Sequence, residues 1–149
     1  MPSSSPSSNR GDRWVWAQFA LMALALVLGL LPPGWPDWLR LLGIPVALGG
    51  VALGVWAGRT LGPSMTAFPK PRDDGVLVED GPYAYVRHPI YTGGFLFFLG
   101  YGLVTSIPAT AAAVALAVLW HFKAGVEERH LATRFAGWED YRRRVRRGP

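Results

Sequence analysis

Residues able to do chemistry are densest in 81–94, GPYAYVRHPIYTGG, directly before a long apolar run. Pro89 suits the first position of a helix, where its missing N–H costs nothing. His88 then falls at the cap with Arg87 just outside it, and the free N–H groups of the helix point back toward both. This partial positive charge and Arg87 would together attract a carboxylate or phosphate. The alternative is that Arg87 and His88 only anchor a transmembrane helix at the interface.

A second polar cluster, residues 123–128, follows the last apolar run. Lys123 and Glu127 stand one helical turn apart on the same face, whereas Glu128 points about a third of a turn away. If the third and fourth apolar runs form a helical hairpin, this cluster must meet residues 83–91 at one end. The resulting pocket would combine cations, carboxylates, tyrosines and a helix start above apolar grooves. It suits a zwitterionic, cationic cofactor with a lipophilic acceptor beneath.

Several kinds of chemistry are excluded or disfavoured by residue type. The chain has no cysteine, which removes disulfides, iron–sulfur ligation and a thiol nucleophile. No serine with a neighbouring base is evident, which argues against acyl-enzyme chemistry. His88, His130, Glu127 and Glu128 have a spacing that matches no common metal site, so we predict none. Three histidines are also too few for a histidine-rich di-iron oxygenase.

The elements that must position these clusters are apolar runs over about 14–31, 41–58, 90–107 and 109–126. The first three are roughly long enough for the 30 Å hydrocarbon core of a bilayer. The fourth is uncharged only to Phe122 and marginal alone, but its helix can continue to Val126 while Lys123 reaches the interface. We therefore predict an all-α integral membrane bundle of four transmembrane helices. If all four span, every lysine and arginine except Arg40 lies on one side, which places both termini and the loop 59–88 in the cytoplasm. This distribution explains the net charge of +5 by topology, and we expect no nucleic acid partner.

The segments outside the spans carry further expectations. Residues 1–13 are rich in Ser and Pro and are expected to be disordered, and 14–149 form the functional domain. Within the loop, the extended apolar patch 75–78 is expected to be an ordered lid or pocket wall. A helical tail over 127–147 places Phe135, Trp138, Tyr141 and Val145 on one face, which predicts a cytoplasmic amphipathic helix lying on an anionic membrane surface. Gly50, Gly54 and Gly58 offer a smooth helix face for close packing, within one chain or between chains.

Methyl transfer from S-adenosylmethionine fits such a pocket because the sulfonium is already activated. The protein mainly has to align methyl group and acceptor and to keep water away. A carboxylate such as Glu127 can bind the ammonium or the ribose hydroxyls of this cofactor, and Arg87 or the helix start can take its carboxylate. The absence of a charged residue inside the first two spans argues against a transporter.

GPYAYVRHPIYTGG followed by EERHLATRFAGWEDYRRRV resembles the paired signature of the isoprenylcysteine carboxyl methyltransferase and phospholipid methyltransferase superfamily of membrane enzymes, over roughly residues 65–147. The resemblance implies S-adenosyl-L-methionine as cofactor. It implies contacts to that cofactor from Gly75, Val76, Leu77, Val78, Tyr83, His88, Pro89, Tyr91 and Glu127. Lys123 stands where the prenylcysteine enzymes have an arginine that helps to place the substrate carboxylate. Lysine keeps the cation but loses the two-pronged geometry, which weakens the case for a prenylcysteine substrate.

We therefore predict an S-adenosylmethionine-dependent methyltransferase in the plasma membrane of a prokaryote, with Arg87, Lys123 and Glu128 acting in catalysis. The acceptor is a lipid or small molecule with a carboxylate, thiol or amine, and the oligomeric state stays open. One alternative is an NADPH-dependent membrane reductase, because sterol reductases resemble the same carboxyl-terminal signature. The other is a non-catalytic membrane scaffold, which would leave the two polar clusters unexplained.

Overall fold

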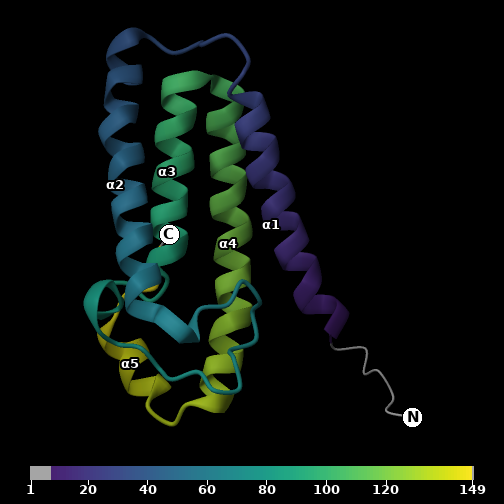
Figure 1. Ribbon diagram of the computed structural model, residues 1–149, viewed down its shortest axis with the longest axis vertical. Coiled ribbons are helices and arrows are strands. Elements are labelled where there is room, and N and C mark those ends of the chain that lie inside the picture. The colour runs from purple at the N-terminus through teal and green to yellow at the C-terminus, as the bar shows by residue number, and fades with distance from the viewer. Residues whose placement is uncertain (1–7, 149) are drawn as a thin grey trace.

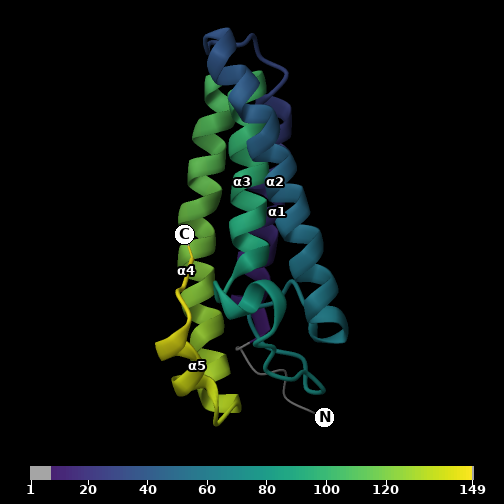
Figure 2. The same cartoon turned by 90° about the vertical axis from the view of Figure 1, so that its left-hand side faces the viewer.

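The computed structural model describes residues 8–148, and all regular secondary structure in this part of the chain is helical, without a β-strand. The long helices are α1 (Ser8–Leu28), α2 (Asp37–Leu61), α3 (Pro89–Thr105) and α4 (Ile107–Arg134), followed by the short α5 (Trp138–Arg144). Two 3₁₀ turns, η1 (Gly62–Ser64) and η2 (Gly81–Ala84), bound the loop between α2 and α3. In Figure 1 the long helices run side by side, with α2 packed on α3, α3 on α4 and α4 on α1. Figure 2 shows that the loop and α5 gather at one end of the bundle.

The α3–α4 hairpin turns at a single residue, Ser106. Its hydroxyl oxygen accepts a hydrogen bond from the Ala109 N–H at 3.2 Å, which satisfies one of the free donors at the start of α4. The same hydroxyl donates to the Leu28 carbonyl at 2.7 Å, and so fastens the end of α1 to the turn. The hairpin brings the start of α3 beside the far half of α4, as the sequence predicts.

Glycines allow α2 and α3 to approach closely. A Cβ added at Gly50 would lie 2.3 Å from the Phe97 nitrogen, and one at Gly93 would lie 2.7 Å from the Gly54 nitrogen. A Cβ at Gly58 would meet only Met65 Sδ, at 4.0 Å. Gly50 therefore packs within the chain against α3, whereas a Cβ at Gly54 would meet nothing within 4 Å. The choice between packing within and between chains stays open for Gly54 and Gly58.

Two of the helices have the length and composition of membrane segments. By length and composition, residues Asp37–Ser64 and Ile107–Arg134 each suffice to cross a membrane, and Pro89–Thr105 is a shorter apolar helix. Leu41, Leu48 and Val51 are exposed along α2, as lipid-facing side chains would be. The all-helical prediction is thus confirmed, whereas crossing by all four helices remains a proposal.

Two sequence-based expectations about the ends of the chain need correction. Disorder over 1–13 is wrong for residues 8–13, which form the first turns of α1; residues 1–7 lie outside the described residues. Extending an existing helix costs far less than starting one, so the apolar stretch of α1 can carry its polar start. In the carboxyl-terminal segment, Trp138, Tyr141 and Val145 are buried in a cluster with Leu77 and Leu131. The predicted apolar face exists, but it packs against the protein's own loop and α4 instead of lying free for a lipid surface.

Candidate active site

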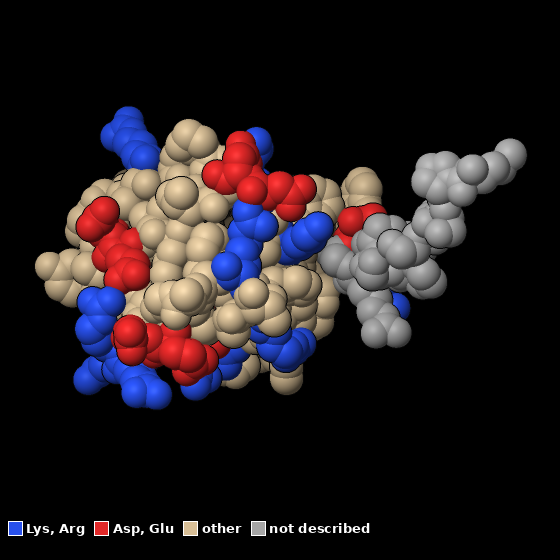
Figure 3. Space-filling model, turned by 90° about the horizontal axis from the view of Figure 1, so that it is seen from below, with Lys and Arg blue, Asp and Glu red and all other residues tan. Residues whose placement is uncertain are grey.

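A cavity of about 370 Å³ lies at the end of the bundle where the loop and α5 cover the helices. Its walls come from α1, the end of α2, residues 64–78 of the loop, the start of α3, α4 and α5. Figure 3 views the molecule from this end and shows lysines, arginines and carboxylates distributed over it. The lining combines a group of polar and charged side chains with apolar residues that include Phe19, Leu61, Met65, Phe68 and Ile90.

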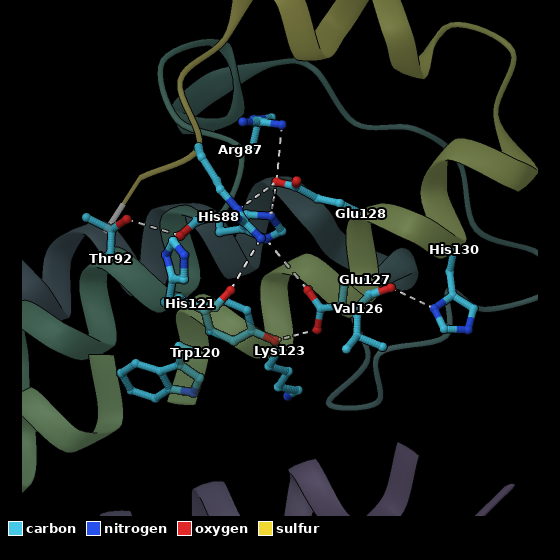
Figure 4. Close-up of polar contacts among 12 residues, drawn as sticks. Arg87, His88, Thr92, Trp120, His121, Lys123, Val126, Glu127, Glu128 and His130 are labelled. Carbon is cyan, nitrogen blue, oxygen red and sulfur yellow. Dashed lines mark hydrogen bonds and ion pairs between the residues drawn. The ribbon is translucent and has the colours of Figure 1, made fainter. Parts of the chain in front are cut away.

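The polar group is built on a contact between the first turn of α3 and the far half of α4. Tyr91 donates its hydroxyl proton to Glu127 Oε1 at 2.5 Å. The imidazole of His88 stacks on the Tyr91 ring, with centroids 5.7 Å apart, and its Nδ1 lies 3.6 Å from Glu127 Oε2. Figure 4 shows His88 between Glu127 and Glu128. The structure thus brings the two predicted clusters together.

The Glu128 carboxylate contacts three basic side chains from different segments of the chain. Its Oε1 lies 3.0 Å from His88 Nε2, 3.2 Å from Arg87 Nη1 and 3.3 Å from Arg147 Nε. The sequence predicts that Arg87 and the start of α3 attract an anion. In the structure, the carboxylate that pairs with Arg87 is that of Glu128. Because Glu128 does not line the cavity, its contact with His88 makes it a positioning group for the imidazole.

The carboxyl-terminal segment packs against this cluster. The Arg87 N–H donates to the Arg146 carbonyl at 2.8 Å, and Val86 and Arg146 form an isolated parallel bridge. The Arg87 guanidinium lies 6.0 Å from the centroid of the Trp138 ring. From the sequence these late arginines are expected only to signal topology, whereas in the structure Arg146 and Arg147 help to hold the wall of the site.

Lys123 is fully buried and lines the cavity. Its ammonium donates to Gln18 Oε1 at 2.8 Å and to the Ala67 carbonyl at 2.7 Å, and it lies 5.2 Å from the centroid of the Tyr91 ring. Lys123 thereby links α1 and the loop to the site. Gln18 is not among the residues predicted from the sequence, although a lone polar residue in an apolar run is a usable signal.

The loop forms an ordered wall, as the patch 75–78 predicts. Leu77 packs on Trp138 and Tyr141, and the Val76 N–H donates to the Ser64 hydroxyl at 3.2 Å. Arg134 donates to the Asp73 carbonyl and so fastens the loop to the end of α4. The Tyr141 hydroxyl donates to the Tyr83 carbonyl at 2.8 Å. Burial raises the pKa of Tyr141 to about 12 and also raises the pKa of Tyr83 well above its usual value, so both phenols stay neutral at physiological pH.

Most of the predicted site residues line the cavity. The cavity is lined by Gly75, Val76, Leu77, Val78, Tyr83, Arg87, His88, Tyr91, Lys123 and Glu127. Two predicted residues lie outside the lining: Pro89, which is buried at the first position of α3, and Glu128. His130 points away from this group in Figure 4, where its Nδ1 lies 2.8 Å from the Val126 carbonyl oxygen. The individual roles of these residues remain predictions.

The fold is a helical bundle with apolar helices long enough to cross a membrane. Its cavity is lined by both charged and apolar side chains. Residues 38–137 match the family model described as phospholipid methyltransferase, and the chain belongs to that family. It is 39% identical over 83 residues to protein-S-isoprenylcysteine O-methyltransferase of Schizosaccharomyces pombe, covering 53% of this chain and 35% of the relative. It is 31% identical over 124 residues to the Rattus norvegicus protein of the same name, covering 76% of this chain and 44% of the relative.

Two further similarities complete this comparison. A cobalt-zinc-cadmium resistance protein of Cupriavidus metallidurans is 38% identical over 76 residues, covering 50% of this chain and 35% of that protein. The solved structure of a eukaryotic intramembrane Ras methyltransferase, isoprenylcysteine carboxyl methyltransferase, superposes with a TM-score of 0.68 at 25% identity, covering 100% of this chain and 54% of that one. The chain thus spans about a third to a half of the length of these relatives. Neither the reductase nor the scaffold alternative is favoured by these comparisons.

Proposed function

We propose that this protein is an S-adenosylmethionine-dependent methyltransferase that acts on a lipophilic acceptor at the membrane. The observation that carries the proposal is the contact between Tyr91 and Glu127, with His88 beside it, in a cavity lined by both charged and apolar side chains. Family membership and the methyltransferase relatives support the same reaction class.

The residues present fit this cofactor. A volume of about 370 Å³ lies in the range of cavities that enclose small molecules. Glu127 offers a carboxylate to an ammonium group or to ribose hydroxyls. Arg87 Nε and Nη1 are buried and make no hydrogen bond to any residue within 8–148, although Nη1 lies close to Glu128. These N–H groups fit the carboxylate end of the cofactor, while Tyr83 and Trp138 provide aromatic surface for its base.

The bound cofactor supplies a methyl group on an activated sulfonium. The chain has to orient the reactants and to exclude water, effects that together can reduce the barrier by several kcal/mol, roughly 7–11 at the extreme. Leu77, Trp138 and Tyr141 close the cavity on the loop side and support this exclusion. Glu128, Arg87 and Arg147 hold His88 in place, so that its Nδ1 faces Glu127.

The apolar lining of the cavity supports an acceptor with a hydrocarbon tail. Phe19 comes from α1 and Leu61 from the end of α2, and α1 packs mainly on α4. The acceptor therefore approaches from the bilayer side, and its reacting group is a carboxylate, a thiol or an amine. Lys123, with two bonds to Gln18 and Ala67, is placed to organise this lining.

The proposed topology has four membrane-crossing helices, with the loop, α5 and both termini in the cytoplasm of a prokaryotic cell. Fourteen of the fifteen lysines and arginines of the sequence belong to segments that the topology puts on that side, Arg40 being the exception. The tendency of basic residues to stay in the cytoplasm supports this orientation. It places the proposed cofactor site where S-adenosylmethionine is available.

Transfer of a radiolabelled methyl group tests the function. Purified protein in nanodiscs is incubated with methyl-labelled S-adenosylmethionine and a lipid extract, and with NADPH in a parallel assay for reduction. We expect label in an extractable lipid and no consumption of NADPH. Consumption of NADPH without transfer of label would overturn the proposal in favour of the reductase, and neither transfer nor consumption would favour the scaffold.

A further inference from the structure

Gln18 is the only glutamine in the 149 residues, and it lies in the middle of an apolar stretch of α1. Its side chain is 8% exposed and lines the cavity. The amide oxygen accepts two hydrogen bonds, from Lys123 Nζ at 2.8 Å and from Trp120 Nε1 at 3.1 Å. Burying an amide among apolar residues costs free energy unless its oxygen and its NH₂ group both have hydrogen-bond partners. The partners of each group therefore have to be identified.

The two partners fix the orientation of this amide. An ammonium and an indole N–H can only donate, so the atom that faces Lys123 and Trp120 must be the oxygen. The NH₂ group then points away from both. Its nitrogen makes no hydrogen bond to a residue in the part of the chain that the structure describes. Two donors are therefore available at the wall of the cavity.

The surroundings of these donors indicate what they meet. Phe19, Met65 and Phe68 line the same cavity as Gln18. Lys123 separates Gln18 from the polar group around Tyr91, because its ammonium touches Gln18 on one side and faces the Tyr91 ring on the other. Gln18 thus presents N–H groups in apolar surroundings, one side chain away from the proposed cofactor site. The head group of a lipophilic molecule would lie here.

We propose that Gln18 recognises the methyl acceptor by donating an amide N–H hydrogen bond to an oxygen of its head group. Lys123 and Trp120 act as positioning residues that keep the donor side of the amide turned to the cavity. The acceptor class is a lipophilic carboxylate or carbonyl compound, because a head group with only N–H donors could not accept this bond. The inference rests on the proposed function.

The single glutamine makes a direct test feasible. Protein labelled with ¹⁵N in glutamine side chains should show one pair of side-chain amide signals in detergent micelles. We expect these signals to shift downfield when S-farnesylcysteine or palmitate is added, and to stay in place with farnesylamine, which has no oxygen. Absence of a shift with both carboxylates, or an equal shift with farnesylamine, would overturn the proposal.

The substitution Gln18→Glu separates recognition from packing. It keeps an oxygen for Lys123 and Trp120 but replaces the NH₂ donor with a second oxygen. We expect the carboxylate that shifts the wild-type signals to bind about 10- to 100-fold more weakly, the range for a hydrogen bond to a charged group. The dissociation constant of S-adenosylmethionine should not change. Unchanged binding of the carboxylate would contradict the proposal.

Lys123 variants test the positioning. In Lys123→Met the amide loses one of the donors that orient it, so we expect its signals to move even without a probe and the shift on adding the carboxylate to shrink. Lys123→Arg keeps a donor and should restore part of that shift. If Lys123→Met leaves both the signals and the response unchanged, Lys123 does not position the amide. Should the wild type show the shifts but not bind S-adenosylmethionine, the proposed function fails and the recognition by Gln18 stands.

Discussion

Tyr91 Oη lies 2.5 Å from Glu127 Oε1, a hydrogen bond that joins the first turn of α3 to the far half of α4 across 36 positions of sequence. The bond forms because the hairpin at Ser106 sets the two helices side by side, and it fixes the carboxylate on which the proposed cofactor site depends. His88, stacked on Tyr91, shares the same carboxylate.

Removal of the Tyr91 hydroxyl should destabilise the protein. Tyr91→Phe leaves Glu127 Oε1 without its donor in a partly buried site, and an unsatisfied group of this kind costs about 1–3 kcal/mol. We expect the free energy of unfolding in detergent to fall by that amount. Tyr85→Phe is the matched control, because Tyr85 is 73% exposed and should change nothing measurable. Equal stability of the two variants would contradict the role of the bond.

The close approach of α2 and α3 should tolerate no side chain at Gly50. An added Cβ would meet the Phe97 backbone nitrogen at 2.3 Å, so Gly50→Ala forces the helices apart and should cost about 1–3 kcal/mol. At the neighbouring Gly49, nothing lies within 4 Å of an added Cβ. There the better helix propensity of alanine should stabilise by up to about 1 kcal/mol. Thermal unfolding of both variants checks this; a Gly50→Ala protein as stable as Gly49→Ala would show that the packing is wrong.

Stability at alkaline pH should depend on Tyr141. Burial raises its pKa from 10.0 to about 12, so between these values the unfolded chain releases the phenol proton while the folded protein retains it. The stability contributed by the neutral phenol is therefore complete below pH 10 and is lost as the pH rises toward 12. Tyr141→Phe should show a smaller loss over this interval. At neutral pH the variant should be less stable by about 1 kcal/mol, because the bond to the Tyr83 carbonyl is gone. Parallel alkaline slopes for variant and wild type would contradict the assignment.

The sequence predicts the parts of this protein that depend on local pattern. The apolar runs predict the positions of the long helices, and Pro89 predicts the start of α3. A hairpin of the third and fourth runs predicts that Glu127 meets the His88 region. Contacts between distant segments were not predictable in this way. Lys123 and Gln18 are 105 positions apart, and no local rule pairs them. The apolar face of Trp138 and Tyr141 could equally have met lipid or protein, because both offer the same contact to an apolar side chain.

Calorimetric titration with S-adenosylmethionine of the wild type, Glu127→Gln and Glu139→Gln in nanodiscs tests the central claim most directly. Glu127→Gln keeps an oxygen for Tyr91 but removes the charge proposed to hold the cofactor, whereas Glu139 is a surface residue paired only with Arg142 within residues 8–148. We predict saturable binding to the wild type and to Glu139→Gln, and binding to Glu127→Gln that is about 10- to 100-fold weaker. Equal affinity of all three proteins, or no binding to the wild type, would contradict the account.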